Sequence, residues 1–218
     1  MQLDFTPPRR HCDSFMRRGF SLVELLAVIG VIAVLIGIAL PAFAGVLRTA
    51  KSVRCQANLR SILSGLQGYR DDHLGLIPWS SVTQSTGKDP GAFGVLADYI
   101  GVPVPAESQD GIYEQIEPYV CPADIGLSEL YGFSYAYRPS SFMQVMPEDW
   151  SRREAMEIIK FFSEPQVFQN GVRYPQGAPV MMDSLRFHLP GSRGRHYPHD
   201  DLRGYNQAFL DGSVRAGK

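Results

Sequence analysis

One carboxylate lies inside the most apolar stretch of the chain. Between residues 20 and 47, Glu24 is the only charged side chain. A carboxylate near the middle of a membrane costs on the order of 3 kcal/mol, so such a residue is expected to have a partner. The partner we expect is a free α-amino group created by cleavage before Phe20, on the same chain or on a neighbour. The alternative is that Glu24 lies at the membrane interface and reaches water.

The apolar stretch is long enough to cross a membrane. A spanning helix needs about 20 apolar residues, and residues 20–47 supply them. Basic residues directly before a span hold that end in the cytoplasm. Here they are Arg9, Arg10, Arg17 and Arg18. We therefore expect a single pass, with a cytoplasmic N-terminus and an extracytoplasmic C-terminal domain.

The start of the stretch resembles the processing site of type IV prepilins and pseudopilins, through the run RRGFSLVELL at residues 17–26. The resemblance implies that prepilin peptidase cuts after Gly19, removes residues 1–19 and methylates Phe20. It also implies that Glu24 neutralises the terminal amine of an adjacent subunit, and that Pro41 locally loosens the helix, as a proline does. The implied location is the bacterial inner membrane or a filament that grows from it.

Two other readings of the N-terminus compete with prepilin processing. The residues Ala42-Phe43-Ala44 before Gly45 have the small-x-small pattern of a signal peptidase site. An uncleaved signal anchor is the other alternative. The apolar run exceeds the roughly 7–15 residues of a signal-peptide core, and it carries an acid near its start, so we favour processing at Gly19.

Removal of the leader would leave two of the three cysteines. Cys12 lies in the leader, whereas Cys55 and Cys121 lie beyond the membrane stretch. In an oxidising compartment such a pair predicts one disulfide, with two separate buried thiols as the alternative. The bridge would close a loop of about 66 residues and contribute roughly 4 kcal/mol in the chain-entropy model.

Periodicity predicts the main elements of the chain. Apolar residues at helical spacing over 48–73 predict one helix from Phe20 to His73 that ends before Gly75 and Pro78. Gly65 and Gly68 within it are expected to allow close packing against a sheet. Further elements are predicted at 91–100 (helix), 133–137 and 180–183 (strands), 147–162 (helix with Met156, Ile159 and Phe162 on one face), and 205–216 (hairpin around Asp211-Gly212).

These elements predict an α+β fold, with a long N-terminal helix packed on a small antiparallel sheet. The expected organisation is a leader at 1–19, a transmembrane and filament-core helix at 20–47, and an extracytoplasmic domain at 48–218.

Three further segments resemble motifs of a pilin-like family abundant in planctomycete-type bacteria. They are Arg54-Cys55-Gln56-Ala57-Asn58-Leu59-Arg60, Val120-Cys121-Pro122-Ala123-Asp124, and the run from Asn206 to Val214. That family usually places a His, nine residues and then Asp-Gly at its end. Here the residue ten positions before Asp211 is Asp201.

The remaining candidates for chemistry are few. His196, His199, Asp200 and Asp201 lie close together, and calcium would suit oxygens from Asp200, Asp201 and Asp211. A solvated polar loop is the reading we favour, so no cofactor is expected. No nucleophile motif surrounds a serine, and the net charge of -1 gives no footprint for nucleic acid.

The sequence thus predicts a structural protein and no enzyme. We expect a subunit of a type IV pilus or of a type II secretion pseudopilus, with prepilin peptidase, the inner membrane and other subunits as partners. The alternative is a membrane-anchored extracytoplasmic binding module that does not polymerise.

Overall fold

The computed structural model describes residues 20–82, 85–143, 151–167, 173–184 and 204–216. The chain divides into two compact units, Met1–Ala44 and Gly45–Lys218. One helix, α1 (Leu22–Asp72), runs from the first unit into the second.

The part of the first unit that the structure describes is an apolar segment of α1. Its segment Leu22–Leu40 has the length and composition to cross a membrane, and none of it is buried within the protein. Leu, Ile and Val fill this segment, so all sides of the helix are apolar, as expected for a helix that lies in lipid or among other helices.

Helix α1 agrees with the predicted helix to within two residues at either end. At its C-terminus, the His73 amide donates to the Tyr69 carbonyl at 3.0 Å and the Gly75 amide donates to the Arg70 carbonyl at 2.8 Å. Leu74 has a positive φ of 56°, so it takes the left-handed position that usually ends such a helix. The helix therefore ends three residues before Gly75, with the Tyr69 and Arg70 carbonyls satisfied.

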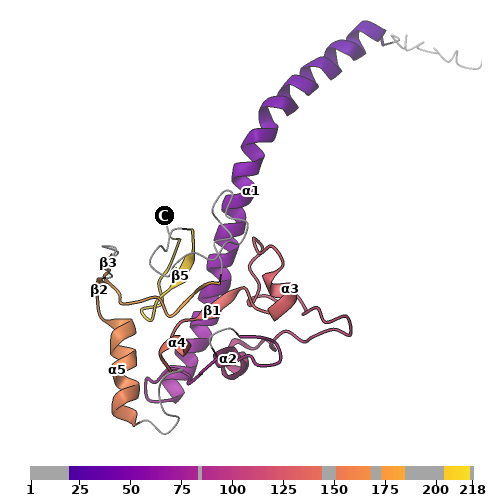
Figure 1. The fold of residues 1–218 in the computed structure, drawn as a ribbon. Coiled ribbons are helices and arrows are strands. Elements are labelled where there is room, and N and C mark those ends of the chain that lie inside the picture. Colours follow the sequence, from indigo (N-terminus) through magenta and orange to yellow (C-terminus); the bar gives the residue numbers. More distant parts are fainter. Residues whose placement is uncertain (1–19, 83–84, 144–150, 168–172, 185–203, 217–218) are drawn as a thin grey trace, which may run out of the picture. The chain divides into compact units, whose positions relative to one another are not determined.

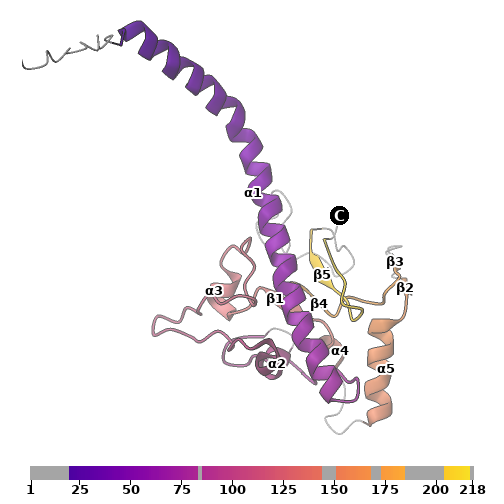
Figure 2. The same cartoon turned by 180° about the vertical axis from the view of Figure 1, so that it is seen from behind.

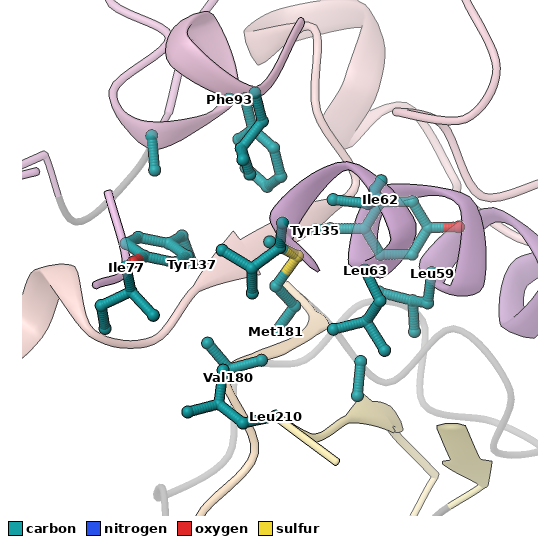
Figure 3. Packing of buried hydrophobic residues seen from close by; sticks show 14 of the residues in the cluster. Leu59, Ile62, Leu63, Ile77, Phe93, Tyr135, Tyr137, Val180, Met181 and Leu210 are labelled. Atoms are coloured by element: carbon teal, nitrogen blue, oxygen red, sulfur yellow. The ribbon is translucent and has the colours of Figure 1, made fainter. Parts of the chain in front are cut away.

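In the second unit, α1 contributes one face to the core. Figure 3 shows Leu59, Ile62 and Leu63 of α1 close to Val180, Met181 and Leu210, with Tyr135 and Phe93 nearby. These side chains belong to one buried cluster. On the other face of the helix, Arg60, Ser61 and Ser64 are exposed. The three-to-four-residue spacing of the buried residues therefore seats this half of α1 on the domain.

A small antiparallel sheet forms the far side of this core. Its strands are β1 (Tyr135–Tyr137), β4 (Met181–Asp183), β5 (Asn206–Ala208) and β6 (Val214–Ala216), in the order β1-β4-β5-β6. Tyr137 pairs with Met181, and Met181 pairs with Ala208. The expected α+β class with a small antiparallel sheet is confirmed.

The predicted hairpin is also confirmed. Strands β5 and β6 pair in register around the Asp211-Gly212 turn. Gly212 has a φ of 84°, which favours glycine, and the Ser213 amide donates to Oδ1 of Asp211 at 2.8 Å.

The described residues of the second unit also form four shorter helices and a second antiparallel strand pair. They are α2 (Ala92–Ile100), α3 (Leu127–Tyr131), α4 (Ser140–Met143), α5 (Arg152–Ser163), and the pair β2 (Gln166–Val167) and β3 (Arg173–Tyr174). In both views, α2 and α3 lie on one side of the C-terminal half of α1 and α5 lies on the other (Figures 1 and 2). Helix α2 agrees with the helix predicted at 91–100.

The helix predicted at 147–162 begins later than expected. Helix α5 starts at Arg152 because Ser151 and Glu154 form a capping box, in which the Ser151 amide donates to Glu154 at 2.6 Å. This bond lowers the pKa of the Glu154 carboxyl. Residues 147–150 lie outside the described part of the chain. Ile159 and Phe162 are buried as predicted, but Met156 is 46% exposed and does not share their face.

The two helix glycines pack against a helix and not against the sheet. A Cβ atom at Gly65 would lie 2.5 Å from Cγ1 of Ile100, and one at Gly68 would lie 3.2 Å from Cδ1 of Tyr99. Both contacts belong to α2. The prediction of close packing at the two glycines is confirmed, but the predicted packing partner, the sheet, is wrong, because the neighbour is α2.

Replacing Ile62 by Ala should lower the free energy of unfolding by about 2–5 kcal/mol, because it opens a cavity in a fully buried position. Thermal or denaturant unfolding of the full chain in detergent would measure this. Ser64→Ala on the exposed face of the same helix is the matched control, with an expected change within about 0.5 kcal/mol. Equal effects of the two substitutions would contradict the assignment of the faces.

Candidate functional site

The first turn of α1 turns the Glu24 carboxylate back toward the N-terminus. Its Oε2 accepts a hydrogen bond from the Ser21 amide at 2.9 Å, and the Leu25 amide donates to the Ser21 carbonyl at 3.2 Å. An acid in this position satisfies a free amide and complements the positive end of the helix dipole. The carboxylate thus binds the Ser21 amide. The nitrogen of the residue before it, Phe20, would become a free amine if the chain were cut before Phe20.

The other predicted processing and assembly residues fall as follows. Phe20 is 75% exposed and precedes the first helical residue, Leu22. Pro41 lies within α1, which continues through it. Gly19 and the leader lie outside the described residues. The structure therefore turns the Glu24 carboxylate toward Ser21, the residue after Phe20, and leaves the cleavage step itself as a prediction.

The large apolar side chains of α1 that the structure describes up to Leu47 are uncovered. Exposed fractions of the large apolar side chains described between Phe20 and Leu47 run from 47% at Ile32 to 78% at Leu22. Removing apolar surface from water is favourable by about 25 cal/mol per Å². An exposed apolar surface of this extent marks an interaction with a membrane or with protein. This helix therefore requires lipid or other helices around it.

Beyond the apolar segment, three neighbouring residues fasten α1 to the loop at 117–121. Cys55 forms a disulfide with Cys121. Arg54 forms an ion pair with Glu117 at 2.8 Å, and the Asn58 amide group donates to the Val120 carbonyl at 2.8 Å. We call these three contacts the staple. Sequence reasoning proposed the cysteine pair but missed its two neighbours.

The members of the staple differ in strength. Hydrogen bonding and charge attraction from Glu117 raise the pKa of Arg54, but both side chains are largely exposed, and exposed pairs contribute little. Asn58 is 6% exposed and Cys55 is fully buried. The disulfide and the partly buried Asn58 hydrogen bond therefore supply most of the attachment.

A partly buried polar network holds the Cys121 side of the staple. Asp124 accepts hydrogen bonds from the Leu127 and Ser128 amides, each at 2.9 Å, and from the Ser134 hydroxyl. The same Ser134 oxygen accepts from the Cys121 amide at 3.0 Å. Asp124 thus caps α3 and positions the loop that carries Cys121. Asp124 lies two residues before Gly126, the N-cap residue of α3, so the usual capping pattern in the sequence does not point to this role.

The predicted calcium candidates are only partly described. His196, His199, Asp200 and Asp201 lie outside the described residues. Asp211 lies in the β5–β6 turn, where it accepts from the Ser213 amide. Among the residues that the structure describes, no group of three His, Cys, Asp or Glu side chains could hold a metal. Calcium binding stays a prediction.

Cys55→Ser should lower the free energy of unfolding by about 4 kcal/mol, the chain-entropy value for a loop of this length. Cys55→Ser with Cys121→Ser should cost no more than the single change. Cys12→Ser, in the leader, is the control and should change nothing in the processed chain. Denaturant unfolding with and without reductant would measure all three. Equal stability of wild type and Cys55→Ser under oxidising conditions would contradict the staple.

The comparisons with known proteins reach the N-terminal segment only. Residues 15–40 match the family model described as the prokaryotic N-terminal methylation motif. No curated protein and no solved structure matches the chain. The matched segment contains Gly19, Phe20 and Glu24, and it covers all of the apolar segment Leu22–Leu40. The motif and the apolar helix together support a membrane-anchored precursor of the type IV pilin-like or pseudopilin kind.

Proposed function

We propose that this protein is a structural subunit of a type IV pilus or of a type II secretion pseudopilus. The observation that carries the proposal is the exposed apolar helix with Glu24 in its first turn, inside a segment that matches the methylation motif. The precursor is cut after Gly19 by prepilin peptidase, and Phe20 becomes the methylated N-terminus.

The apolar half of α1 serves two environments in turn. In the inner membrane, lipid covers it, with the N-terminus in the cytoplasm and the domain outside. During assembly the same surface leaves lipid and packs against the apolar helices of other subunits. In both states the apolar side chains are removed from water, so a single helix provides the anchor and the filament core.

Glu24 links processing to assembly. Cleavage before Phe20 creates a positive amine close to the carboxylate that already binds the Ser21 amide. In a low-dielectric surrounding, opposite charges attract strongly. We infer that Glu24 compensates an amine in the membrane, and that in the filament it pairs with the Phe20 amine of a neighbour. This exchange would set the register between subunits.

The disulfide fits a domain outside the cytoplasm, because such bonds form and persist in oxidising compartments. Two segments that resemble motifs of the planctomycete-type pilin-like family, around Cys55 and around Cys121, are the ones that the disulfide joins. We infer that the domain is a variant of that family, with Asp201 at the position of its usual histidine.

Glu24→Ala should leave cleavage and membrane insertion intact but reduce recovered filaments about tenfold or more, since an unpaired buried charge costs about 3–5 kcal/mol. Glu24→Gln removes the charge but keeps the shape of the side chain, because the side-chain oxygen of glutamine can still accept a hydrogen bond from the Ser21 amide. It should fail like Glu24→Ala. Immunoblots of membranes and of sheared filaments would measure both. Normal filaments from Glu24→Gln would show that charge pairing is not required.

Wild-type protein that is processed but never found in sheared filaments or in a pseudopilus would contradict the proposal. A membrane-anchored binding module would then be the better account. Exposure of the globular domain to added protease on spheroplasts would check the orientation in the same preparations.

A further inference from the structure

An apolar patch lies on the surface of the second unit, away from α1. Ile112 is 50% exposed, Leu130 is 67% exposed and Tyr131 is 37% exposed. The two segments that carry them are neighbours, because the Tyr113 amide donates to the Glu129 carbonyl at 2.9 Å. We call this surface the α3 patch.

Acids surround the α3 patch. Asp110 and Glu114 flank Ile112 in the chain, Glu129 precedes Leu130, and all three are exposed. No ion pair recorded for the described residues involves them, whereas nearby Glu107 pairs with Lys88 at 2.6 Å. The patch therefore offers an apolar centre with an uncompensated negative rim.

A surface of opposite charge lies on α1. Arg48 and Lys51 are exposed and precede Cys55 by two helical turns and one turn, so they project from the face that carries the domain. One residue after Lys51, the Ser52 hydroxyl donates to Oδ1 of Asn206 in β5 at 3.4 Å. Neither cation takes part in an ion pair within the described chain. We call Arg48 and Lys51 the basic step.

We propose that the α3 patch of one copy docks on the basic step of a second copy of this chain. The charges are complementary, and the neighbouring Leu47, 62% exposed, offers apolar contact to Ile112 and Leu130. Each copy carries both surfaces at different places, so the contact is heterologous and can continue from copy to copy in an open helical array. Complementary charge of this kind fixes register and orientation more than affinity.

A second copy accounts for more of the observations than lipid does. Anionic headgroups would compensate Arg48 and Lys51 but would repel the acids of the α3 patch and leave its apolar centre in water. A second copy compensates both surfaces at once. The inference rests on the proposed function, because the anchored helices bring copies together with α1 in a common direction.

A charge swap tests the contact. Arg48→Glu with Lys51→Glu should reduce sheared filaments about tenfold or more, and Asp110→Lys with Glu114→Lys should do the same. The chain with all four substitutions should recover filaments to within about twofold of wild type, because each altered surface meets its altered partner in the next copy. Arg152→Glu with Arg153→Glu, on the exposed start of α5, is the matched control and should assemble normally.

Two readings separate misfolding and lipid binding from the proposed contact. Each variant must form the Cys55–Cys121 disulfide in membranes, as judged by thiol labelling, before its filaments are counted. A lipid role for the basic step predicts loss in the first variant and no recovery in the swapped chain. Normal filaments from either half-swap, or no recovery from the full swap, would overturn the proposal.

Cross-linking separates this proposal from the filament function. Copies with Lys51→Cys and copies with Glu114→Cys, both in a Cys12→Ser background, are expressed together and treated in membranes with a short bis-maleimide, which adds one cysteine thiol at each end. A mixed dimer is the expected result. A dimer without any filaments would uphold the contact and reject the filament role, whereas wild-type filaments without a dimer would reject the contact alone. If neither forms, both are rejected.

Discussion

The constraint on which the rest of the structure depends is that one helix, α1, must be stable in two different surroundings, an apolar one along its first part and the folded domain along its second. Up to Leu47 the exposed side chains of α1 are apolar on all sides apart from Glu24, and from Cys55 onward only one face is buried. Water cannot surround the first part without a large cost in free energy, and the second part needs the domain to cover its apolar face. The position of that change along α1 determines where the membrane segment ends and where the domain begins.

The domain is fastened to α1 where the helix leaves the apolar segment. A force that pulls on the apolar segment of α1 reaches the domain through the turns of α1 around residues 54–58, where the staple lies. Packing of Leu59, Ile62 and Leu66 in the core stabilises the contact between α1 and the domain. The disulfide links two residues of this contact that are distant in the sequence. The polar network of Asp124 and Ser134 holds the far end of that bond in place. Helix, sheet and loop thus depend on one another around Cys55 and Cys121.

Long periodic patterns and strong turn signals allowed prediction from the sequence. They were sufficient for α1 and for the Asp211-Gly212 hairpin, because both depend on residues close in the chain. They also indicated single strands such as β1 and β4, whose pairing joins distant residues, for example Tyr137 and Met181. Contacts across the fold were harder. Gly65 could be expected to pack closely, but nothing local indicated Ile100 as its neighbour. Met156 has the spacing of a core residue, yet the burial of α5 centres on Ile158, Ile159 and Phe162. The capping box at Ser151 was a readable signal that would have placed the start of α5.

The most direct test of the account is the mass of the mature N-terminal peptide from native membranes. The account predicts a peptide that begins with N-methylated Phe20, because only that cut creates the amine that Glu24 would compensate. A mature chain that begins at Gly45 would remove the apolar segment of α1 and contradict the filament role. An unprocessed Met1 would contradict it as well and leave a plain membrane anchor.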